Sequence, residues 1–121
     1  MRGLGRRSQG SGSMTINEYQ KLAMTTLNPE LGQRDVLLNS VMGLCGESGE
    51  AIDLVKKHLM QGHDFDKQKF AGELGDIAWY LAETATALDL SLEDIMAANI
   101  EKLRKRYPEG FDSSRSIHRD E

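Results

Sequence analysis

The sequence predicts an all-α protein whose four helices form a bundle-like protomer. The 121-residue chain has only two prolines, and proline interrupts the interior of a helix. Its apolar residues recur at three- and four-residue spacing over long segments, which is the period of an amphipathic helix. Helix-capping residues stand at the starts of several of these segments, beginning with Thr15.

The first two helices are expected at about 15–27 and about 34–59. Thr15 and Glu18 have the spacing of a capping box, in which each side chain bonds to a backbone N–H near the other. The segment 28–32, Asn-Pro-Glu-Leu-Gly, combines residues that end helices and form turns. It therefore separates the two helices.

Two further helices are expected at about 66–88 and from Ser91 to just before Pro108. The segment 61–64, Gln-Gly-His-Asp, is the turn that precedes the first of them. Because the connections are short, consecutive helices are expected to be mostly antiparallel neighbours.

The chain is predicted to hold one domain, residues 14–111, between two polar ends. Residues 1–13 are basic and rich in Gly and Ser, without the apolar stretch of a signal peptide. We interpret them as a disordered arm or the remnant of an expression tag. From Glu109 onward the sequence is polar, so an irregular tail is expected over 112–121, with Phe111 as an anchor.

Composition excludes several classes of protein. A net charge of −4 argues against DNA or RNA as a partner, because nucleic-acid binding needs a basic surface. No apolar run approaches the roughly 20 residues of a membrane-spanning helix, so no membrane partner is expected. Cys45 is the single cysteine; no intrachain disulfide can form, which fits a reducing, cytoplasmic location.

The functional prediction depends on two carboxylate pairs, Glu47-x-x-Glu50 and Glu73-x-x-Asp76. Each pair lies on neighbouring turns of one helix face. On a helical projection both pairs merge with an apolar stripe, so the acids are expected to face the bundle interior. Four acids there would repel and would be costly to desolvate unless a cation lay among them.

A single pair of this kind is usually a solvated helix face, but its occurrence on two helices favours a metal site. Carboxylate oxygens are hard ligands, and neither pair has the histidine three residues on that di-iron bundles use. Mg²⁺ is therefore predicted, with Mn²⁺ as a substitute. Because Mg²⁺ often completes its coordination with phosphate oxygens, a nucleotide polyphosphate is the expected ligand.

Together with two later motifs, these pairs resemble the MazG-like all-α nucleoside triphosphate pyrophosphohydrolases. The resemblance covers about residues 15–111 and rests on Gly-Glu-Ser-Gly-Glu at 46–50, Glu-Leu-Gly-Asp at 73–76, Asn-Ile-Glu-Lys at 99–102 and Arg-Tyr-Pro at 106–108. It implies a helical dimer or tetramer that depends on Mg²⁺. It also implies cleavage of a (d)NTP between the α- and β-phosphates, giving a (d)NMP and pyrophosphate.

The resemblance also implies roles for single residues. The positions that match its metal ligands and catalytic acids are Glu47, Glu50, Glu73 and Asp76. The positions that match its substrate contacts are Asn99, Lys102, Arg106 and Tyr80. For the basic residues the alternative is a solvated last helical turn, and for Tyr80 an ordinary core position.

The helices at 34–59 and 66–88 are apolar on most faces, which predicts burial in a homodimer or tetramer through these helices. Trp79 is expected on a different side from Glu73, in such a contact. Three alternatives remain open at this stage. They are a phosphoribosyl-ATP pyrophosphohydrolase, a dimeric dUTPase-like enzyme, and a non-catalytic helical module that binds a nucleotide or a protein.

Overall fold

The computed structural model of the protein describes residues 13–118, and all the regular elements in this range are helical. They are α1 (Ile16–Ala23), the 3-10 helix η2 (Met24–Thr26), α2 (Gln33–Gln61), α3 (Lys67–Ala87), α4 (Leu92–Arg106) and α5 (Ser113–Ile117). The all-α prediction is confirmed. The expectations for residues 1–12 and 119–121 fall outside the described residues. None of the helices in 13–118 combines the length and apolar character needed to cross a membrane.

Helix starts follow the capping residues. Thr15 and Glu18 form the predicted capping box, with each side chain bonded to the other's backbone N–H. Asp66 caps α3 and Ser91 caps α4 through their side-chain oxygens. Local sequence therefore determines where these helices begin.

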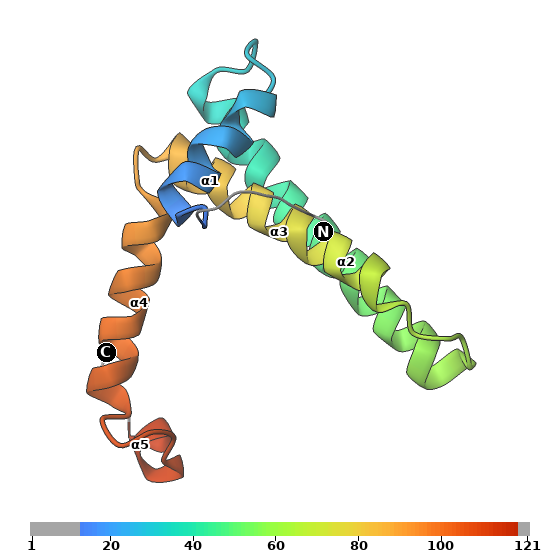
Figure 1. The fold of residues 1–121 in the computed structure, drawn as a ribbon, viewed down its shortest axis with the longest axis vertical. Coiled ribbons are helices and arrows are strands. Elements are labelled where there is room, and N and C mark those ends of the chain that lie inside the picture. The colour runs from blue at the N-terminus through green and yellow to red at the C-terminus, as the bar shows by residue number, and fades with distance from the viewer. Residues whose placement is uncertain (1–12, 119–121) are drawn as a thin grey trace.

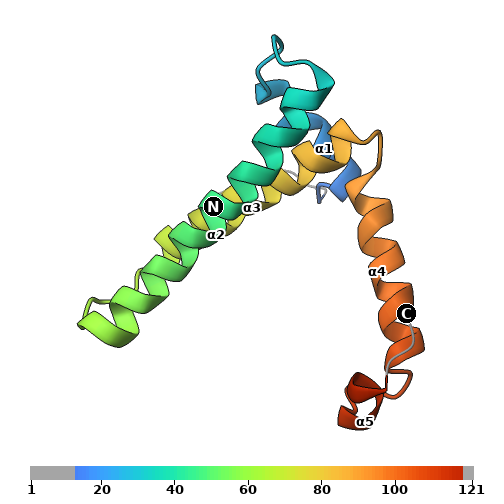
Figure 2. The same ribbon diagram turned by 180° about the vertical axis from the view of Figure 1, so that it is seen from behind.

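The pairing of α2 with α3 dominates the fold, and the two helices run side by side in opposite directions (Figures 1 and 2). Gln33 Nε2 donates to the Ala87 carbonyl at 2.8 Å where the chain enters the pair. Farther along, Asn39 Nδ2 donates to both carboxyl oxygens of Glu83, at 3.1 and 3.0 Å. Gly62, in the left-handed conformation (φ 76°), ends α2 at the far tip, which suits a residue without a Cβ.

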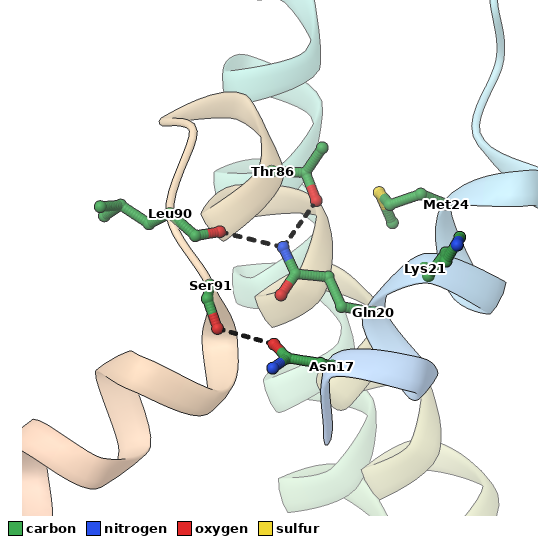
Figure 3. A pocket seen from close by; sticks show the side chains of 7 residues that line it. All are labelled: Asn17, Gln20, Lys21, Met24, Thr86, Leu90 and Ser91. Atoms are coloured by element: carbon green, nitrogen blue, oxygen red, sulfur yellow. Dashed lines mark hydrogen bonds between the residues drawn. The ribbon is translucent and has the colours of Figure 1, made fainter. Parts of the chain in front are cut away.

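The side chain of Gln20 helps to fasten α1 to the C-terminal end of α3 (Figure 3). Gln20 Nε2 donates to Thr86 Oγ1 and to the Leu90 carbonyl, both at 3.0 Å. Its Oε1 accepts from the Leu92 N–H at 2.8 Å. The amide thus joins α1, the end of α3 and the start of α4.

The predicted four-helix bundle does not form within the single chain. Helix α4 leaves the α2–α3 pair at a steep angle after a short turn, so it is not the antiparallel neighbour that the short connection suggested (Figures 1 and 2). Asp89 in this turn has a positive φ of 56°. Leu92, in the first turn of α4, is buried, whereas the apolar residues beyond it are exposed: Ile95, Met96, Ile100 and Leu103.

The predicted irregular tail contains a short helix, α5, which Asp112 caps. Phe111 does not act as a buried anchor, because 77% of its surface is exposed. Its ring centroid lies 5.5 Å from that of Tyr107.

The core of the described chain is small. Its buried cluster consists of Ala23, Ala82, Ala85 and Leu92. The largest side chains that are fully buried are both polar, Glu83 and Ser40. Large apolar side chains along α2 remain half or more exposed, among them Leu38, Met42 and Ile52. One chain therefore leaves much apolar surface uncovered.

We predict that Asn39→Ala destabilises the protein. It removes the amide that bonds both oxygens of the fully buried Glu83, so the free energy of unfolding should fall by about 1–3 kcal/mol. Urea unfolding followed by circular dichroism measures the change. Arg34→Ala breaks an exposed ion pair with Asp35 and is the control, expected to stay within about 0.5 kcal/mol. Equal stability of the two variants would contradict the prediction.

Candidate metal and nucleotide site

Three of the predicted acids lie close together where α2 packs against α3. One carboxylate oxygen from each of Glu47, Glu73 and Asp76 lies within 4.8 Å of the other two. The antiparallel pairing of the helices explains this. Each advance of three or four residues along α2 brings it to face a residue three or four positions earlier in α3. The register that joins Asn39 to Glu83 therefore brings Glu47 to Glu73 and Asp76.

The acids are strained electrostatically without a cation. The pKa of Glu47 is raised, first by a hydrogen bond shared with the Glu73 carboxyl, then by partial burial. The negative charges of Glu73, Asp76 and Glu50 raise it further. Glu73 Oε2 is buried and has no hydrogen-bond partner among the described residues. A buried acceptor without a donor is costly, and a cation between the carboxylates would relieve both effects.

The acids do not face a closed interior, contrary to the expectation from the helical projection. Glu47 and Glu73 are half-buried, whereas Asp76 and Glu50 are exposed. Helix α4 turns away from the α2–α3 pair (Figures 1 and 2), and the exposure of Asp76 and Glu50 leaves the acids accessible in the single chain. Glu50 lies one turn beyond Glu47 and outside the group of three, although its charge acts on Glu47.

A cavity of about 380 Å³ adjoins the acids, and it is lined by Glu47, Asp76, Trp79 and Tyr80. Tyr80 thus lies beside Glu47 and Asp76, and its contact with substrate, which the resemblance implies, stays a prediction. Trp79 also lines the cavity, beside Glu47 and Asp76. Its expected place, on a different side of the helix from Glu73 and in a contact between chains, stays a prediction. The spacing could have indicated that Trp79 lies beside Asp76, because it follows Asp76 by three residues and shares its face of α3.

Trp79 also fastens the site to the N-terminal segment. Its indole Nε1–H is shared between the Ala23 carbonyl at 3.0 Å and Thr26 Oγ1 at 2.9 Å. Tyr19 of α1 packs against the same core, and burial together with the charge of Asp76 raises the pKa of its phenol. Contributions from α1 were not expected, because nothing in the sequence shows which face of α3 this helix covers.

The three α4 residues implied by the resemblance are not brought to the acids of the same chain. Asn99 and Lys102 are exposed on the helix that diverges from the α2–α3 pair (Figure 1). Arg106 is half-buried, with its guanidinium carbon 5.9 Å from the centre of the Tyr107 ring. Their assignment to phosphate stays a prediction.

A larger hollow, of about 500 Å³, lies between α1, the end of α3 and the start of α4 (Figure 3). Its polar groups are bonded to one another: Gln20 to Thr86, and Ser91 Oγ to Asn17 Oδ1 at 2.8 Å. Among the described residues that line it, Lys21 is the one with a charged side chain. The three acids, and not this hollow, therefore form the candidate metal site.

The residues present fit a hard divalent cation. All the donors in the group of three are carboxylate oxygens, the type that Mg²⁺ and Mn²⁺ prefer over softer metals. The unpartnered oxygen of Glu73 supplies a free lone pair at the site. An open face leaves room for water and phosphate oxygens, which usually complete the coordination of Mg²⁺.

The fold and the group of three carboxylates define the chain as an all-α protein with a site that can hold a metal ion. Comparison with known proteins identifies its family. Residues 38–111, which contain every acid of the site, match the MazG nucleotide pyrophosphohydrolase domain. The Gene 37 protein of Mycobacterium phage L5 is 36% identical over 105 residues, which cover 80% of this chain and 92% of that protein. No solved structure matches the chain significantly. The chain belongs to the MazG nucleotide pyrophosphohydrolase domain family.

The raised pKa of Glu47 predicts a pH-dependent response to metal. The ordinary value is 4.5, and the shift is upward, so the bond shared with Glu73 stabilises the metal-free fold at low pH. That contribution is lost as the pH rises through the higher folded-state value. Cations bind the deprotonated acids, so the gap between melting temperatures in Mg²⁺ and in EDTA should widen from about pH 5 to about pH 7.5.

Differential scanning calorimetry across this range measures the gap. Glu47→Gln cannot titrate and should flatten the pH dependence in EDTA. A gap that stays constant or narrows as the pH rises would contradict the prediction.

Proposed function

We propose that the protein is a Mg²⁺-dependent nucleoside triphosphate pyrophosphohydrolase. The reaction adds water across the anhydride between the α- and β-phosphates of a (d)NTP, and releases a (d)NMP and pyrophosphate. The buried Glu73 Oε2, unpartnered inside a group of three carboxylates, is the observation that carries this proposal. It supports a cation site in a chain whose family acts on nucleotides.

In this proposal Glu47, Glu73 and Asp76 hold the metal, and Glu50 completes the acid face. Mg²⁺, when bound, neutralises charge on the phosphates. The half-buried Glu47 and Glu73 are fixed by the packing of α2 on α3, so their oxygens are positioned before substrate binds. One of the four acids accepts the proton that the attacking water loses. Trp79 and Tyr80, at the wall of the adjoining cavity, bind the nucleoside end.

We further propose that the active form is a homodimer or tetramer in which α4 of one chain serves the acids of another. Within one chain Asn99 and Lys102 lie on a helix that points away from the acids (Figure 2). The apolar side of α4 and much of α2 are uncovered, and an apolar surface of this extent is typical of an interface. Its burial against a second copy would bring positive charge to the phosphates.

Glu73→Gln should abolish turnover while the fold persists. The amide keeps the shape but removes the charge that holds the metal, so kcat should fall by about a hundredfold or more. A panel of NTPs and dNTPs with Mg²⁺, scored for pyrophosphate against orthophosphate, gives the reaction type and the base preference. Glu101→Gln, an exposed acid paired with Arg104 on α4, is the matched control. If the wild-type protein releases no pyrophosphate from any nucleotide of the panel, the proposed enzymatic activity is refuted.

Light scattering at micromolar concentration should give at least twice the 13.5 kDa chain mass. If sites are shared between chains, Glu73→Gln and Lys102→Ala are each inactive alone. After the two variants are mixed through mild denaturant, heterodimers carry one intact site, and about one quarter of wild-type activity should return. A monomeric active protein, or a mixture that stays inactive, contradicts the shared site.

A further inference from the structure

Gly43 and Tyr80 touch where α2 crosses α3, one turn from the acids. A Cβ added at Gly43 would overlap the Cδ1, Cε1 and Cζ atoms of the Tyr80 ring. The other glycines of the two helices differ, because a Cβ would meet nothing within 4 Å at Gly46, Gly49, Gly72 or Gly75. Among these positions, Gly43 is the one where the described chain requires a hydrogen in place of a side chain.

The Tyr80 ring is confined on two sides. The backbone of α2 at Gly43 lies against one side. On another side Trp79 packs edge-on, with the ring centroids 5.1 Å apart and the planes at 87°. Trp79 itself is held by its hydrogen bonds to Ala23 and Thr26. The ring also lines the cavity beside the acids, which gives it space on that side.

This cavity has two chemically different walls. Glu47 and Asp76 form an acidic wall, and Trp79 and Tyr80 form an aromatic one. Aromatic faces and edges suit a flat heterocycle, while the acids suit cation-bound phosphates. A volume of about 380 Å³ lies within the range of small-molecule sites.

We propose that Gly43 is a positioning residue for substrate selection: by letting Tyr80 lie against α2, it keeps open the subsite for the nucleobase and sugar. A Cβ at this position forces the ring off α2 and toward the cavity, so the subsite narrows while the acids are untouched. The inference rests on the proposed function, since it gives the nucleoside end of the same substrate a place to bind.

Two probes separate the nucleoside subsite from the metal and phosphate site. The four α,β-imido dNTP analogues carry a base, sugar and phosphates and resist cleavage at the α–β position, whereas inorganic tripolyphosphate carries phosphates alone. Binding with Mg²⁺ is followed by the emission of Trp79, the single tryptophan of the chain, and by calorimetry. Wild-type protein should bind both probes.

Gly43→Ala should weaken binding of the best imido analogue by roughly tenfold, the scale of one aromatic contact, and leave tripolyphosphate binding unchanged. The matched control is Gly49→Ala. Gly49 lies on the opposite side of α2 from Glu47 with open space at its Cβ, so this variant should bind both probes as wild type does. If Gly43→Ala binds the analogues with wild-type affinity, the proposal is wrong while the proposed function stands.

A double-mutant cycle tests the route through Tyr80 even if Gly43→Ala folds poorly, because Tyr80→Ala removes the ring that would clash. Tyr80→Ala alone should weaken analogue binding and spare tripolyphosphate. In that background Gly43→Ala should add no further loss. Wild-type affinity in Tyr80→Ala, or additive losses in the double variant, overturns the inference. If wild-type protein binds neither probe, it is the proposed function that fails.

Discussion

The antiparallel register of α2 on α3 is the constraint on which the rest of this structure depends. It pairs Asn39 with Glu83, Gly43 with Tyr80, and Glu47 with Glu73 and Asp76. A shift of one helical turn would break all three pairings at once. It would leave the buried Glu83 without its amide donor.

The Asn39–Glu83 pair gives the register its specificity. Apolar contacts between helices tolerate sliding, because their energy depends on area and not on direction. A fully buried carboxyl tolerates little sliding, since each of its oxygens needs a donor at hydrogen-bond distance. The bond from Asn39 to the buried Glu83 therefore stabilises one alignment of the helices, and that alignment positions the acids two turns away.

The packing of α2 on α3 also holds the acids in an arrangement that is locally unfavourable in free energy. Glu47 and Glu73 share a hydrogen bond although both carry negative charge when ionised, and one oxygen of Glu73 lacks a donor. Rigid packing on one side and an open face on the other keep the carboxylates together but accessible. Such an arrangement is unfavourable for the empty protein and favourable for one that binds a cation. The aromatic pair Trp79 and Tyr80 lines the cavity beside these acids.

Sequence alone indicated the four main helices, the caps at Thr15 and Ser91 and the candidate acids. Capping residues act through neighbours three residues away, so Thr15 and Ser91 could be read directly, and the repeated acid pairs singled out the metal candidates. The tertiary structure decided what depends on the relative placement of helices. It turned α4 away from the bundle, brought Trp79 to the cavity and opened the acid face to solvent. It also paired Gly43 with Tyr80, a contact between residues 37 positions apart that no local spacing predicts. Such contacts follow from the rotation and register of packed helices, which side-chain shapes and buried hydrogen bonds fix only after the chain has folded.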